Sequence, residues 1–170
     1  MTPWSGDDEV ITNLMADRGF VALSVDYSTR RRYPNNCADL SEAVAQVFDA
    51  SDSSSAINQI AALAKADINK GIVVAGFSQG GNLASLANNY NSSVEAAFVI
   101  GHGYVGWGAD CYKSQYITLG ANSMRSVMGA NDAAFTPYFT DDPRTMVEQT
   151  TGYSCGASAI NCEQPDGSGP

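Results

Sequence analysis

The stretch Gly71-Ile-Val-Val-Ala-Gly-Phe-Ser-Gln-Gly-Gly81 decides the fold of this chain of 170 residues. Residues 71–77 form an almost unbroken apolar run, which is typical of a strand buried on both faces of a parallel sheet. A helix is predicted directly after it, over residues 79–89. The single residue between the two elements, Ser78, is therefore expected on a sharp turn from strand to helix.

This turn carries the pattern G-x-S-x-G, from Gly76 to Gly80. The pattern alone is weak, because a chain with 16 glycines matches it by chance roughly once in six or seven such chains. At a strand-to-helix turn it becomes informative, since the flanking glycines let backbone segments approach and the serine hydroxyl is raised above the sheet. The Gln79 amide could then donate to a developing oxyanion. Ser78 is a candidate nucleophile; the alternative is a glycine-rich turn that only joins strand to helix.

Strands and helices alternate outward from this core. Further strands are predicted at 20–27, 96–100 and 125–128, and helices at 7–18, 38–49, 57–64 and 143–150. Such alternation predicts right-handed βαβ units, with residues 71–77 and 96–100 paired in parallel. We expect one α/β domain over residues 1–170, a three-layer sandwich around a short, mostly parallel sheet of about four or five strands. Residues after position 152 form a tail rich in Gly, Ser and Cys.

Composition argues against several classes of partner. The formal net charge is −9 with nine Lys and Arg, so the surface repels phosphate backbones and anionic lipid. The short cluster Arg30-Arg31-Arg32 is interpreted as a solvated loop rather than a binding patch. We therefore expect neither nucleic-acid nor membrane binding, and no apolar run reaches the length of about eighteen residues that a membrane span needs. The opening Met1-Thr-Pro-Trp-Ser-Gly-Asp-Asp8 is not interpreted as a signal peptide.

The four cysteines, Cys37, Cys111, Cys155 and Cys162, fit no zinc-binding spacing. In an acidic chain poor in lysine they favour disulfides, and hence a secreted or periplasmic protein. Cys155 and Cys162 are close enough in sequence to close a small loop, which would leave Cys37 for Cys111. Other connectivities stay open, as does the alternative of buried free thiols in a cytosolic protein.

Three segments together resemble the α/β-hydrolase superfamily, close to secreted bacterial carboxylesterases and to dienelactone-hydrolase-like and polyester-hydrolase-like enzymes. Arg18-Gly-Phe-Val-Ala-Leu-Ser-Val-Asp-Tyr27 is similar to the family's fourth strand and its entry. Gly76–Gly81 is similar to the nucleophile elbow, and Gly129-Ala-Asn-Asp132 to the turn that carries the acid after the seventh strand. The resemblance covers roughly residues 5–135 and implies an α/β-hydrolase core.

By this resemblance, Asp132 is the acid that orients a catalytic imidazole. The alternative is a turn residue that caps the following segment. Asp141 and Asp142 are nearby rivals, but they are better explained as caps before Pro143.

Two parts of the family pattern have no counterpart here. These are the loop that supplies the second oxyanion-hole amide and the histidine after the eighth strand, so the comparison implies a chain shortened at both ends. The one histidine, His102, follows the predicted strand at 96–100 and is a candidate base. We expect it to line the crevice without bonding to Ser78. The alternative is a loop residue between two glycines.

The predicted function is hydrolysis of small carboxylic esters through an acyl-enzyme on Ser78, with no metal and no organic cofactor. The alternative is a non-catalytic or barely active module that associates with itself. In the family's strand order the missing third strand lies between residues 20–27 and 71–77. Either the strand at 20–27 moves next to 71–77, or unpaired sheet edges are left that a homodimer could fill.

Overall fold

The computed structural model describes residues 5–28, 37–101, 116–129 and 143–155. Its elements, in chain order, are helices α1 (Ser5–Ala16), α2 (Cys37–Phe48) and α3 (Ala56–Ala61), the short 3-10 helix η1 (Ile68–Lys70), strand β1 (Ile72–Phe77), helix α4 (Gln79–Tyr90), strand β2 (Val94–Ile100), the 3-10 helix η4 (Ala121–Ser123), strand β3 (Met124–Val127) and helix α5 (Pro143–Thr151). The predicted helices are all present, with ends shifted by a few residues. Among these described helices, none is long and apolar enough to cross a membrane.

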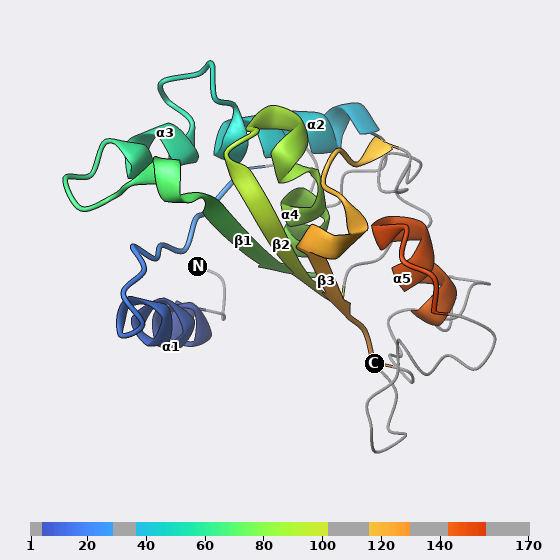
Figure 1. The fold of residues 1–170 in the computed structure, drawn as a ribbon. Coiled ribbons are helices and arrows are strands. Elements are labelled where there is room, and N and C mark those ends of the chain that lie inside the picture. The colour runs from blue at the N-terminus through green and yellow to red at the C-terminus, as the bar shows by residue number, and fades with distance from the viewer. Residues whose placement is uncertain (1–4, 29–36, 102–115, 130–142, 156–170) are drawn as a thin grey trace.

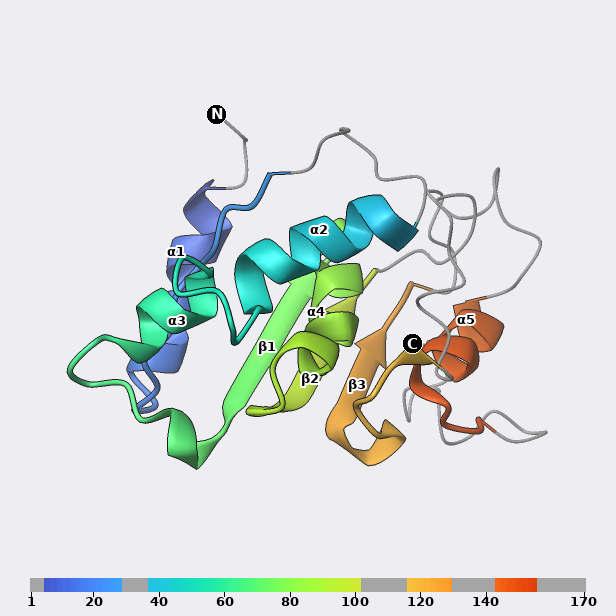
Figure 2. The same ribbon diagram turned by 90° about the horizontal axis from the view of Figure 1, so that it is seen from above.

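The sheet is parallel, with the order β1-β2-β3 in the described residues. β1 pairs with β2 from Ile72 opposite Val94 to Phe77 opposite Ile100. β3 pairs with β2 in the same direction, up to Val127 opposite Ile100. Helix α4 makes the connection between β1 and β2, which confirms the predicted parallel pairing and the α/β class. Figures 1 and 2 show α2 and α4 on one side of this sheet.

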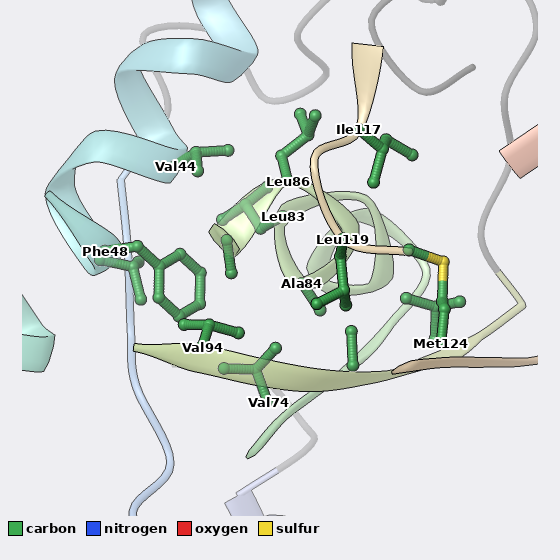
Figure 3. Close-up of a cluster of buried hydrophobic side chains, with 14 of the residues drawn as sticks. Val44, Phe48, Val74, Leu83, Ala84, Leu86, Val94, Ile117, Leu119 and Met124 are labelled. Atoms are coloured by element: carbon green, nitrogen blue, oxygen red, sulfur yellow. The ribbon is translucent and has the colours of Figure 1, made fainter. Parts of the chain in front are cut away.

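The hydrophobic core lies between the sheet and the helices α2 and α4 (Figure 3). Strand residues that alternate along one face point into it, because successive side chains of a strand point to opposite faces. Helix α4 is buried over a whole segment, residues 81–87, since α2 covers its outer side. The core residues labelled in Figure 3 are Val44, Phe48, Val74, Leu83, Ala84, Leu86, Val94, Ile117, Leu119 and Met124.

The prediction of a strand at residues 20–27 is wrong. These residues form no strand, and Phe20, Val21 and Leu23 are exposed. Only the end of the segment reaches the core, where Val25 and Tyr27 pack against it and burial raises the pKa of the Tyr27 hydroxyl. The apolar composition was correctly identified, but a strand also needs a neighbouring edge to pair with, and no described strand pairs with this segment. The described sheet therefore has three strands instead of about four or five.

The two faces of the sheet give a test of this arrangement. Val99 in β2 is fully buried on the helix-covered face, whereas Val73 in β1 is 59% exposed on the other face. Val99→Ala is expected to lower the free energy of unfolding by about 2 kcal/mol, because it removes buried methyl groups and leaves a cavity. Val73→Ala should cost less than about 0.5 kcal/mol. Chemical denaturation of both variants measures the difference, and equal costs would contradict the one-sided core.

The two cysteines in the described residues, Cys37 at the start of α2 and Cys155 after α5, are both disulfide-bonded. Cys111 and Cys162 lie outside the described residues, so the pairing of Cys155 with Cys162 stays a prediction. Peptide mapping without reduction should yield one linked peptide pair that contains both residues. Linkage of Cys155 to any other cysteine would contradict it.

Candidate active site

Ser78 occupies the single position between the end of β1 and the start of α4. Its backbone has φ 53° and ψ −120°, and no other non-glycine residue in the described ranges has a positive φ. This conformation costs an L-residue about 1–3 kcal/mol and persists only where the surroundings enforce it. The strained elbow that the G-x-S-x-G pattern predicts is therefore present.

Backbone hydrogen bonds on both sides hold this conformation. The Ser78 amide donates to the carbonyl oxygen of Ile100 at 2.9 Å, which extends the β1–β2 ladder by one residue. The Ser78 carbonyl oxygen accepts from the amides of Gly81 at 3.0 Å and Asn82 at 3.3 Å, which starts helix α4. One residue thus belongs to the sheet through its amide and to the helix through its carbonyl, and the turn between them is sharp for this reason.

The glycine at position 76 is required by the same turn. A Cβ atom there would lie 2.0 Å from the carbonyl oxygen of Gly80 and 2.6 Å from the amide nitrogen of Gly81. The first turn of α4 therefore rests directly on the backbone of β1. At Gly80, in contrast, an added Cβ would meet nothing within 4 Å. Of the two motif glycines, only the first is needed for close backbone approach.

Within the described residues, the polar groups at the elbow make no hydrogen bond that would keep them from a ligand. Ser78 is the N-cap residue of α4, yet its hydroxyl makes no capping bond. The amides of Gln79 and Gly80 donate to no backbone carbonyl in the described parts of the chain. Unsatisfied amides at a helix N-terminus carry partial positive charge and favour an anionic oxygen. The sequence analysis named only the Gln79 amide as an oxyanion donor. The Gly80 amide lies in the same first turn of α4 and was missed, although a helix predicted from residue 79 already implies it.

His102 and Asp132 are the other two candidates. The chain segments that lead to them leave the sheet at the carboxyl ends of its strands, where Ser78 also lies. Gly101 follows β2 and donates its amide to the carbonyl oxygen of Val127, the last residue of β3, at 2.8 Å. Because parallel strands end together, the ends of β1, β2 and β3 are neighbours. His102 and Asp132 themselves lie outside the described residues, so their geometry relative to Ser78 is not part of the described structure.

Asn82, a buried polar residue one helical turn after Ser78, was not predicted from the sequence. Asn82 is fully buried in α4, and both its amide nitrogen and its amide oxygen lack a hydrogen-bond partner. An asparagine within the otherwise apolar and small-residue segment 80–87 was the only signal available. Among the described residues, no group of three or more His, Cys, Asp and Glu side chains is placed to hold a metal ion.

A comparison with protein families matches residues 4–134 to the model of the dienelactone hydrolase family. The chain belongs to the dienelactone hydrolase family. The matched range includes the elbow and both positions His102 and Asp132. No curated protein and no solved structure matched the chain.

Membership of the dienelactone hydrolase family confirms the suspected relationship and the α/β-hydrolase fold. The family is one of hydrolases, which supports hydrolytic activity as the general function. Within the described residues, Ser78 is the non-glycine residue with a positive φ, and it lies at the turn from β1 to α4.

Proposed function

We propose that this member of the dienelactone hydrolase family is a serine hydrolase that cleaves small carboxylic esters through an acyl-enzyme on Ser78. The observation that carries the proposal is the backbone of Ser78, with φ 53° and ψ −120° at the N-terminus of α4. A strand and a helix can also be connected by a longer, unstrained turn. The strained single-residue turn suits a nucleophile, because it raises the serine hydroxyl above the sheet next to the amides at the start of α4.

In the proposed reaction, the Ser78 oxygen attacks the ester carbonyl carbon while a base accepts the hydroxyl proton. The carbonyl oxygen becomes an oxyanion, which the Gln79 amide stabilises as one half of an oxyanion hole. The bond to the alcohol then breaks, and the alcohol leaves with the proton. Water attacks the acyl-enzyme in the same way and releases the carboxylic acid. Asp132 is proposed as the acid that orients the base.

The direct test is a burst experiment with p-nitrophenyl butyrate. A first turnover should release about one p-nitrophenol per active chain, and intact-mass measurement should show a butyryl adduct that proteolysis maps to Ser78. Labelling elsewhere, or no labelling with an activated ester, would count against the proposal.

The identity of the base is a separate prediction. We propose that His102 lines the crevice without bonding to Ser78, and that this chain hydrolyses esters feebly. His102→Asn should therefore lower kcat/KM by no more than about threefold, well short of the effect of losing a general base. Steady-state hydrolysis of p-nitrophenyl acetate measures it. A loss of about a hundredfold would instead make His102 the working base.

The rival function is a non-catalytic module that acts by self-association. The observation that favours it is the outer edge of β1, which pairs with no strand in the described structure because residues 20–27 form none. Open strand edges of this kind are sites where a second chain can pair. Dimerisation without any p-nitrophenol burst would favour the module over the enzyme.

We propose a secreted or periplasmic location. Disulfides persist in oxidising compartments, and both Cys37 and Cys155 are disulfide-bonded. Fractionation of a cell that expresses the natural gene, with alkylation of free thiols before lysis, tests the location and the redox state together.

A further inference from the structure

One face of the sheet carries an apolar surface that no described element buries. Alternate strand residues point to this open face, and the pairing of the strands sets them side by side. The open face consists of Val73, Ala75 and Phe77 of β1, Ala96, Phe98 and Ile100 of β2, and Arg125 and Val127 of β3. Val73 is 59% exposed and Phe77 60%.

The single charged side chain on the open face does little to make it polar. Arg125 folds back and donates through Nη1 to the carbonyl oxygens of Asn122 at 3.1 Å and Met124 at 2.8 Å. Beside it lies a shallow hollow of about 330 Å³, lined in part by Val73 and Phe98. The hollow is set back from the strand ends where Ser78 lies, so it is not the acyl site.

A parallel sheet with one open face is unusual. Parallel sheets occur almost only where both faces are covered, because their strands are apolar on both sides. β1 and β2 carry apolar residues on both faces, as expected for strands that are buried on both sides. One of these apolar faces is nevertheless left exposed by the described residues.

Helix α1 adds a second exposed apolar surface on the same side of the sheet, opposite α2 and α4 (Figures 1 and 2). Val10, Ile11 and Leu14 form a stripe along the helix, and these side chains are about half exposed, at 57%, 58% and 49%. The helix makes no extensive contact with any other described element. A helix of 12 residues is marginal in water without packing, so α1 also needs a partner surface.

We propose that a second copy of this chain covers the open face and the α1 stripe, in a symmetric dimer that is independent of the reaction at Ser78. A two-fold axis lets the same surface serve on both subunits, which suits an apolar surface without fixed charge pairs. This interface uses a face of the sheet, and so differs from strand pairing at a sheet edge.

The exposed area is sufficient for such a dimer. The open face and the α1 stripe offer seven large apolar side chains that are about 40–60% exposed, namely Val10, Ile11, Leu14, Val73, Phe77, Phe98 and Val127. They amount to on the order of 600 Å² of apolar surface, which is as large as the largest patch on a typical monomer. With a polar rim this approaches the ≈ 800 Å² per partner of a stable interface.

The test is sedimentation equilibrium of the full chain with its disulfides intact. The wild type should dimerise with a dissociation constant of about 10 µM or lower. Phe98→Asp on the open face and Ile11→Asp on α1 should each raise that constant by at least about a hundredfold, since each buries an unpaired charge. Leu63→Asp is the matched control, because Leu63 is 46% exposed after α3 and belongs to neither surface. It should leave dimerisation unchanged.

Thermal unfolding of the same variants separates the outcomes. All three substituted side chains are partly exposed, so the monomers should retain their fold. A wild type that is monomeric at several hundred micromolar would overturn the proposal. If, in that case, the Ile11→Asp variant unfolds at a lower temperature than the wild type, α1 covers the sheet of its own chain instead. Dissociation by Phe98→Asp but not by Ile11→Asp would overturn the part given to α1. The p-nitrophenol burst should be the same in every variant, so its failure would bear on the enzyme and not on the dimer.

Discussion

Ser78→Ala is expected to eliminate the p-nitrophenol burst and the butyryl adduct, and to lower ester hydrolysis at least about a thousandfold or to the uncatalysed rate. The reason is that the variant loses the proposed attacking oxygen while the amides at the start of α4 stay in place. Alanine accepts the elbow conformation no worse than serine, so the fold should be retained. Circular dichroism and the midpoint of thermal unfolding check this.

Ser78→Gly separates the backbone strain from the chemistry. Glycine adopts a positive φ without steric cost, so this variant should be more stable than Ser78→Ala by about 1 kcal/mol while being equally inactive. Ser85→Ala, in the same helix, removes a buried hydroxyl that donates to the carbonyl oxygen of Asn82 and should keep the burst. Full activity in Ser78→Ala would refute the acyl-enzyme on Ser78, and lower stability of the glycine variant would refute the strain.

Gly76→Ala is expected to destabilise the fold strongly. The new Cβ would lie 2.0 Å from the carbonyl oxygen of Gly80 and 2.2 Å from its carbonyl carbon. Both are backbone atoms at the start of α4, so no side chain can rotate to relieve the overlap. We expect a loss of more than about 4 kcal/mol in the free energy of unfolding, or failure to fold.

The matched control is the same substitution at the other motif glycine. Gly80→Ala adds its methyl group where nothing lies within 4 Å, and alanine is favoured over glycine inside a helix. This variant should be as stable as the wild type or more stable by up to about 1 kcal/mol. Urea denaturation of both proteins measures the contrast. Equal stability of the two variants would mean that α4 does not rest on β1 as described.

Much of the centre of the fold could be predicted from the sequence. The run before Ser78, the helix after it and the strand that follows are each determined by nearby residues, and the crossover rule makes β1 and β2 parallel. The strained elbow was predictable for the same reason, because a strand that meets a helix at a single residue leaves that residue few conformations. Ser78 and the Gln79 amide were therefore identified from sequence, whereas the positions of His102 and Asp132 relative to them depend on how separate loops pack.

What the sequence by itself determined is local: which segments are apolar, which segments are helical, and that Ser78 is the turn between β1 and α4. Only the tertiary structure decided that residues 20–27 form no strand although their composition resembles that of β1. It also decided that Val99 is buried while Val73 is exposed. The physical reason is that helical hydrogen bonds join residues four apart, whereas a strand and a buried face exist only where a distant part of the chain, or another chain, supplies the partner.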